Sequence, residues 1–169
     1  MGGGYKFDYP PLLAPGRHHL TLAQIERMCV TPFKTSTTRE KLFYALEEMV
    51  QQFLRENMRC DFLIDGSFFT EKIDPSDVDI AVRLDVDFQE TMNASQAILV
   101  DAANDMDYIA GIDSYVYVAF PRGHVLFDTD ANERETWAEQ YGWEHSEQWL
   151  KGMAVLILGE TDVGIRIRR

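Results

Sequence analysis

The sequence predicts an α+β fold that contains both helices and strands. Segments with apolar residues at three- and four-residue spacing, typical of amphipathic helices, occupy much of the first half of the chain. Short β-branched and aromatic segments bounded by Gly, Pro or Asp are typical of strands and interrupt the helical pattern. With 169 residues, 46% of them hydrophobic and 26% charged, we expect a single domain over residues 1–169.

The first 19 residues predict an extended arm, because they are rich in Gly and Pro and show no period. Within this arm, His18 and His19 are adjacent, so their side chains diverge, and no Cys or His follows at a ligand spacing. We therefore expect surface histidines there. The Thr-Leu-Ala-Gln sequence that starts at Thr21 is a capping box, and it predicts a short helix to about residue 29.

The longest helix is predicted from about residue 38 to 57. Thr37 and Glu40 have the spacing of a second capping box at its start. Apolar residues then recur at three- and four-residue spacing: Leu42, Leu46, Met49, Val50, Phe53 and Leu54. Such a stripe is typical of a helix that packs on a hydrophobic core.

The strongest functional pattern lies in the middle of the chain. The apolar run 62–64 ends at Asp-Gly-Ser, which predicts a turn at Gly66 and Ser67. Nine residues separate Ser67 from Asp77, and Asp79 follows within an apolar strand. A strand alternates its faces, so both carboxylates point the same way. Their repulsion is relieved by a divalent cation, and carboxylate oxygens favour Mg²⁺.

This Gly-Ser turn, with a spacer of about ten residues and an Asp-x-Asp strand, resembles the signature of the polymerase-β-like nucleotidyltransferases. The resemblance implies a nucleotidyltransferase fold, a mixed β-sheet backed by helices. It implies that Gly66 and Ser67 hold the triphosphate of a nucleotide, with ATP as the expected one. It also implies that Asp77, Asp79 and a third acid on a neighbouring strand hold two Mg²⁺ ions. Lys72, in the spacer, is a further candidate for a phosphate contact or a solvated loop lysine.

More narrowly, the segment GSFFTEKIDPSDVDI is similar to a group of small bacterial proteins with a GSFVT-like turn. Their N-termini also carry a Pro-Pro-Gly pattern followed by Thr-Leu-x-x-Ile, which here runs from Pro10 to Ile25. The minimal antitoxin-type nucleotidyltransferases have an Arg-Gly pair soon after the serine, whereas this chain has Phe68-Phe69-Thr70. Relation to that group implies a toxin–antitoxin or phage-defence context.

Asp113 and Asp128 are the candidates for the third acid. Asp113 lies at the start of a predicted strand, residues 112–120, and Asp128 ends a returning hairpin strand, residues 124–128. In a simple hairpin these two acids face opposite sides of the sheet, so only one of them serves. We favour Asp113, whereas a bulge near Gly123 would favour Asp128.

The rest of the chain predicts four further elements: a weakly amphipathic helix at about 89–105, a helix at 133–141, a buried strand at 153–158 and an edge strand at 163–167. Asp85 and Asp87 continue the two-residue period but lie roughly 20 Å beyond Asp79 at strand rise. We expect solvated loop acids there. Arg83 shares the face of Asp79, where it either neutralises the site or pairs with acids.

The net charge of −12 argues against a long nucleic acid as partner, because such partners are bound by basic surfaces. A nucleotide bound with Mg²⁺ remains compatible, since the metal supplies positive charge. No apolar run approaches the roughly 18 residues of a membrane span, and the N-terminus lacks a signal-peptide pattern. Cys29 and Cys60 are too few for a disulfide framework. We expect a cytoplasmic protein without membrane contact.

These observations and the resemblance predict a Mg²⁺-dependent nucleotidyltransferase that moves a nucleoside monophosphate onto a hydroxyl of a protein or small molecule. Asp77 and Asp79 would orient the triphosphate through one metal, and Asp79 and Asp113 would activate the acceptor hydroxyl through a second. The alternative is a non-catalytic module of the same fold that binds a nucleotide or a partner protein such as a cognate toxin. A metal-dependent nuclease has less support, because no Lys or His follows the Asp-x-Asp at the usual spacing.

Overall fold

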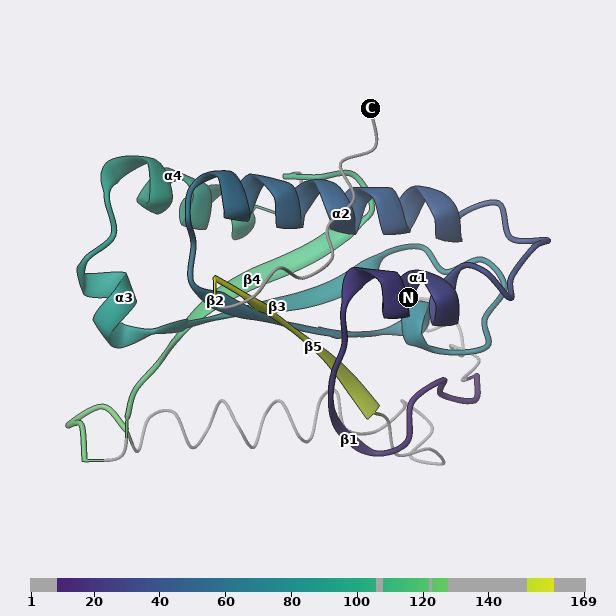
Figure 1. Ribbon diagram of the computed structural model, residues 1–169, viewed down its shortest axis with the longest axis horizontal. Coiled ribbons are helices and arrows are strands. Elements are labelled where there is room, and N and C mark those ends of the chain that lie inside the picture. Colours follow the sequence, from purple (N-terminus) through teal and green to yellow (C-terminus); the bar gives the residue numbers. More distant parts are fainter. Residues whose placement is uncertain (1–8, 106–107, 122, 128–151, 160–169) are drawn as a thin grey trace, which may run out of the picture.

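The computed structural model shows an α+β fold built on a five-stranded mixed sheet with strand order β1-β5-β2-β3-β4 (Figure 1). The structure describes residues 9–105, 108–121, 123–127 and 152–159. The strands are β1 (Gly16–His19), β2 (Cys60–Asp65), β3 (Val78–Asp85), β4 (Ile112–Ala119) and β5 (Gly152–Leu158). The helices are α1 (Leu22–Cys29), α2 (Arg39–Arg55), α3 (Val86–Glu90) and α4 (Ala94–Ala103), with a 3₁₀ turn η1 (Ser67–Phe69).

Strand directions in the sheet are mixed. The central strand β2 runs antiparallel to both β3 and β5, while β3 pairs in parallel with β4 and β1 in parallel with β5. A parallel pair needs a crossover connection, and α3 and α4 supply it between β3 and β4. As a result, the start of β4 returns to the same end of the sheet as the start of β3.

The two predicted helices of the first half are present, but only one of the two predicted capping boxes is. The Thr21 hydroxyl accepts a hydrogen bond from the Gln24 amide, which caps α1 as expected. The longer helix, α2, begins at Arg39 instead, and its N-cap Thr38 makes no side-chain cap. The Thr37 cap prediction is wrong, because the Thr37 amide and hydroxyl both donate to the Asp74 carboxylate.

Two predictions in the second half of the chain are also wrong. The single helix predicted over residues 89–105 is divided into α3 and α4, because the Asn93 side chain caps a new helix by accepting from the Gln96 amide. Residues 123–127 form turns instead of a returning strand. The predicted buried strand is confirmed as β5. The helix at 133–141, the edge strand at 163–167 and Asp128 lie outside the described residues.

The hydrophobic core lies between the sheet and the helices, with α2 and α4 on one face of the sheet (Figure 1). In β3, Val78, Ile80 and Val82 belong to this core. The opposite face carries a smaller apolar cluster that includes Ala81. Because side chains alternate along a strand, Asp79 lies on this second face, away from the helices.

The described part of the N-terminal arm is extended, as the sequence predicts, and it runs beside the segment that follows η1. Pro11 forms an antiparallel bridge with Thr70, and the Leu12 amide donates to the Phe69 carbonyl over 2.8 Å. Further along the arm, β1 pairs with β5. His18 is half-buried and bonds through Nε2 to the Ala14 carbonyl. Among the described helices, none is both long and apolar enough for a membrane span.

Candidate functional site

The turn that ends β2 is built around Gly66. Its φ of 80° and ψ of −168° lie in a region of backbone conformation that is essentially restricted to glycine. The chain then enters η1, where the Phe69 amide donates to the Gly66 carbonyl over 3.2 Å. The Thr70 amide donates to the Ser67 carbonyl over 3.3 Å. The Gly-Ser pair of the sequence is therefore a tight turn at one end of the sheet.

The carboxylate of Asp79 lies directly against this turn. A Cβ atom added to Gly66 would come within 1.6 Å of Asp79 Oδ2, so the carboxylate occupies the space that any side chain would need. Glycine is required here both by its backbone conformation and by this contact. The sequence patterns at Gly66 and Asp79 belong to one stretch of the chain, and the fold brings them into contact at one place.

The strand register continues this arrangement across the sheet. Asp65 is paired with Asp79 between β2 and β3, and Asp79 is paired with Asp113 between β3 and β4. Paired residues of neighbouring strands project from the same face. Asp65, Asp79 and Asp113 therefore form one line on three strands, called here the acidic row. The exposure of the side chains increases along it, because Asp65 is 1% exposed, Asp79 half-buried and Asp113 exposed.

The sequence-predicted acids occupy different positions relative to this row. Asp79 is at its centre, and Asp113 is the register neighbour that the sequence proposal requires. Asp77 precedes the first residue of β3 by one position and is half-buried. In the described part of the chain, the acidic, His and Cys side chains do not already form a group of three that could hold a metal ion.

Asp65 is the member of the acidic row that sequence reasoning missed. It is the last residue of β2 and directly precedes Gly66, so its place beside the Gly-Ser pair was visible in the sequence. Its position opposite Asp79 depends on the register between two strands, and no turn pattern in the sequence determines that register. Its adjacency to the turn was therefore the only available signal.

Arg39, at the start of α2, is a second residue that sequence reasoning missed. Its side chain is buried, and its guanidinium lies 3.7 Å from the Phe33 ring centroid. It donates to five backbone carbonyls, those of Cys29, Phe68, Thr70, Lys72 and Ile73. Burial lowers the pKa of Arg39, while the negative charge of Asp74 opposes that shift. Four of these carbonyls lie within residues 68–73, after the Gly-Ser turn.

The loop between η1 and β3 is also held by its own polar groups. The Asp74 carboxylate accepts from the Thr37 amide over 2.7 Å and from the Ser36 hydroxyl over 3.0 Å. The bond from the Thr37 amide is the main reason that the pKa of Asp74 lies below its ordinary value. Lys72, the predicted phosphate contact, is half-buried in this loop, and its carbonyl accepts from Arg39 Nη2 over 2.6 Å.

Neither cysteine has the properties of a nucleophile. Cys29 and Cys60 are both free and buried. Burial raises the pKa of the Cys29 thiol to about 12 and raises that of Cys60 as well. A thiol with so high a pKa carries almost no thiolate at neutral pH, so both act as core residues.

Comparison with known proteins gives one match. The model of a family of unknown function, DUF6932, matches residues 5–157. The chain belongs to the DUF6932 family. The matched range contains the turn, the acidic row and Arg39. No curated protein and no solved structure matches this chain.

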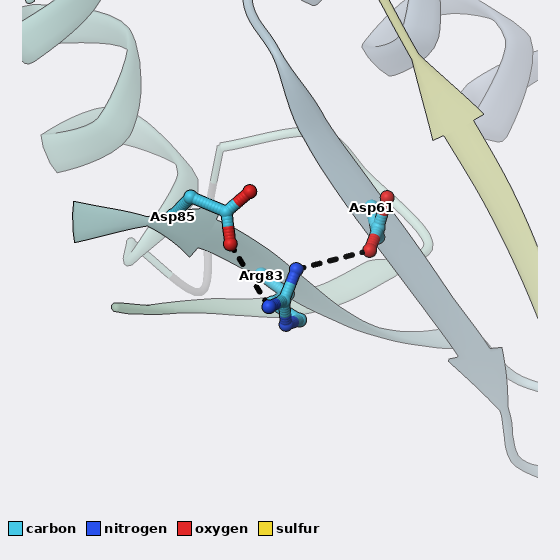
Figure 2. Close-up of polar contacts among 3 residues, drawn as sticks. All are labelled: Asp61, Arg83 and Asp85. Atoms are coloured by element: carbon cyan, nitrogen blue, oxygen red, sulfur yellow. Dashed lines mark hydrogen bonds and ion pairs between the residues drawn. The ribbon is translucent and has the colours of Figure 1, made fainter. Parts of the chain in front are cut away.

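The opposite end of the sheet in this DUF6932 protein has a different charge pattern. Arg83 Nη1 lies 3.2 Å from Asp61 Oδ2, and Arg83 Nη2 lies 2.9 Å from Asp85 Oδ1 (Figure 2). Arg83 therefore pairs with local acids rather than with Asp79. Asp85 and Asp87 are exposed as expected, but they belong to β3 and α3 instead of a loop.

A cavity of about 470 Å³ adjoins these ion pairs. Its walls include both charged and apolar side chains, among them Arg59, Arg83, Asp85, Phe88, Phe120 and Ile157. It lies about six strand residues, or roughly 20 Å, from the acidic row. The cavity and the turn are therefore separate features of the same sheet.

Proposed function

We propose that this DUF6932 protein is a Mg²⁺-dependent nucleotidyltransferase of the polymerase-β-like type, which transfers a nucleoside monophosphate from a triphosphate such as ATP to a hydroxyl group. The observation that supports this most is the meeting of Gly66, Asp79 and Asp113 at one end of the sheet. A turn without a side chain beside a row of carboxylates can place phosphate groups and cations close together.

The donor set at this end fits Mg²⁺, which takes oxygen ligands from carboxylates together with substrate phosphates. Asp77 and Asp79 would hold one ion together with the triphosphate, and Asp79 and Asp113 would hold a second. Ions bound there would neutralise phosphate charge and lower the pKa of the acceptor hydroxyl. Asp65, paired with Asp79 on the same face, would add carboxyl oxygens beside the ions.

The turn and its loop would bind the rest of the substrate. Gly66 allows the Asp79 carboxylate to lie against the turn, and the Ser67 amide and hydroxyl would donate to phosphate oxygens. Lys72 would add a point charge near the outer phosphates. The acceptor hydroxyl would then attack the α-phosphate in line with the leaving pyrophosphate. Catalysis would consist of positioning and charge neutralisation without a covalent enzyme intermediate.

The charge of the chain narrows the choice of acceptor. At −12, the protein repels a long nucleic acid, so we propose a protein or small-molecule hydroxyl as the acceptor. Two buried free cysteines fit the reducing cytoplasm, where we place the protein. A toxin–antitoxin or phage-defence setting, with a cognate toxin as partner, follows from the resemblance to antitoxin-type nucleotidyltransferases.

A second candidate function is a non-catalytic module of the same fold that binds a nucleotide or partner protein. The observation that favours it is that the described acids are not already gathered into a group of three around a metal position. The exposure of Asp113 also leaves its carboxylate free to contact a partner. Nucleotide binding without transfer would support this candidate.

Two experiments test the proposal in sequence. Calorimetric titration of the four nucleoside triphosphates, with and without Mg²⁺, is expected to give Mg²⁺-dependent binding that Asp77→Asn abolishes. Transfer of label from α-labelled ATP to co-purified or added acceptors then tests catalysis. Label transfer that persists in the Asp77→Ala, Asp79→Ala protein would contradict the proposed function, and Asp87→Asn, an exposed acid of α3, is the matched control.

A further inference from the structure

The segment that follows the Gly-Ser turn, residues 68–72, is held from two directions. Arg39 donates to the carbonyls of Phe68, Thr70 and Lys72 over 2.6–2.7 Å. The N-terminal arm forms hydrogen bonds with the two residues between these. The Leu12 amide donates to the Phe69 carbonyl, and the Glu71 amide donates to the Pro10 carbonyl. Arg39 and the arm thus bond to alternate residues of one short segment.

Arg39 is suited to this role by its shape. Its five N–H groups form a rigid planar fork, and its hydrogen bonds involve Nε, Nη1 and Nη2. The side chain is 1% exposed, and its bonds to the Phe68 and Thr70 carbonyls are buried, where an unpaired carbonyl would be costly. Lysine has a single ammonium group and cannot reach several separate carbonyls at once. The fork, rather than the charge alone, determines the position of the segment.

The hydrogen bonds continue from this segment to the turn. The Thr70 hydroxyl donates to the Ser67 carbonyl over 2.8 Å, and the Thr70 carbonyl is itself bound by Arg39 Nη2. Thr70 is 2% exposed. Thr70 therefore links Arg39 to Ser67 through these two hydrogen bonds.

We propose that Arg39 is the positioning residue of the Gly66–Ser67 turn, which it holds in the conformation that receives a nucleoside triphosphate. This inference rests on the proposed function. A turn that is already ordered loses less conformational entropy on binding, so its ligand binds more tightly. Arg39 does not itself contact the substrate and acts through Phe68, Thr70 and Lys72.

The test compares Arg39→Lys with Arg55→Lys, a matched change at the exposed last residue of the same helix. In Arg39→Lys, Mg²⁺–ATP affinity is expected to fall about tenfold or more by calorimetry. Hydrogen exchange at the amides of Phe69, Thr70 and Glu71 is expected to accelerate by a similar factor, while β2 exchange stays unchanged. Measurement at a temperature where both variants are fully folded excludes an effect of the unfolded fraction. Arg55→Lys is expected to match the wild type in both measurements.

Thr70→Val provides the test if Arg39→Lys does not fold, because it removes the bond to the Ser67 carbonyl and nearly preserves the side-chain volume. It is expected to weaken Mg²⁺–ATP binding in the same direction. Wild-type affinity in both Arg39→Lys and Thr70→Val would overturn this inference and leave the proposed function intact. Absence of triphosphate binding in the wild type itself would overturn both. Faster exchange throughout the sheet in Arg39→Lys would show a general structural role and overturn the positioning role.

Discussion

The two ends of strands β2 and β3 carry charges in opposite arrangements. At the turn end, the register pairs Asp65 with Asp79, two acids. At the other end it pairs Asp61 with Arg83, and Arg83 also reaches Asp85 (Figure 2). Like charges opposite one another destabilise a sheet, whereas opposite charges stabilise it. The comparison indicates that the pairing of Asp61 with Arg83 is a structural feature, whereas the proposed function assigns cation binding to the acidic row.

The two ends also differ in how the backbone is held. The turn end depends on one glycine conformation, one buried arginine and a loop anchored by Asp74. The other end depends on ion pairs between partly exposed side chains, which contribute little to stability. Substitutions at the turn end should therefore have larger effects, on both stability and binding.

The largest effect is expected for Gly66→Ala. The new Cβ would lie 1.6 Å from Asp79 Oδ2, and alanine disfavours this backbone conformation, so unfolding free energy should fall by about 3 kcal/mol. Urea unfolding measures this change. Gly123→Ala is the matched control, because Gly123 also has a positive φ, of 90°, but nothing within 4 Å of an added Cβ. It should lose about 1 kcal/mol, and equal losses in both variants would contradict the role assigned to the Asp79 contact.

The second prediction compares acids from the two ends. Asp79→Asn should weaken Mg²⁺–ATP binding more than about a hundredfold, because a central ligand of the proposed ions loses its charge. Asp113→Asn should weaken it by a smaller factor, since Asp113 lies at the edge of the acidic row. Calorimetry with Mg²⁺ measures both. Asp85→Asn, in the same strand at the other end, should retain wild-type affinity. Equal losses for Asp79→Asn and Asp85→Asn would show that overall charge, not the row, controls binding.

A smaller effect is expected at the ion-paired end. Arg83→Met should lower unfolding free energy by about 1 kcal/mol, because it leaves Asp61 and Asp85 without their shared cation. A double-mutant cycle with Asp61→Asn should give a coupling of about 0.5 kcal/mol that decreases at high salt. Mg²⁺–ATP affinity should not change. A loss of affinity in Arg83→Met would show that the two ends are not independent.

The smallest effect concerns pH. Hydrogen bonds from Thr37 and Ser36 hold the pKa of Asp74 below its ordinary value, so its carboxylate stabilises the fold above that ordinary value. This contribution is lost as pH falls through the lowered pKa. Asp74→Asn keeps an acceptor oxygen but does not titrate, so its stability should depend less steeply on pH below about 4. Unfolding followed from pH 5 to pH 2.5 measures the difference, and parallel curves for both proteins would contradict the assignment.

Much of the local structure could be predicted from the sequence. The Thr21 capping box, the apolar stripe of α2 and the apolar run of β5 each depend on residues close together in the chain. One prediction is wrong because of a distant group: Thr37 bonds to Asp74 instead of capping α2. Another is wrong for a local reason, because the Asn93 cap begins a new helix where the apolar pattern was weak.

The candidate site was predictable only in part. Gly66, Ser67, Asp77 and Asp79 lie within one short stretch, and their residue types and spacing are visible in the sequence. Asp113 was one of two candidates for the third acid. The pairing of β3 with β4, which places Asp113 beside Asp79, could not be read from the sequence. Asp65 and Arg39 were missed, because their importance depends on contacts across the sheet and between α2 and the loop.

The sequence alone determined that this chain has a glycine turn followed by two acids at strand spacing, because these features depend on backbone conformation and side-chain alternation. The tertiary structure decided that Asp65, Asp79 and Asp113 share a row, that Arg83 pairs elsewhere and that Arg39 holds the loop. Strand register and buried hydrogen bonds join residues that are far apart in the chain, and their geometry exists only once the sheet and α2 have packed together.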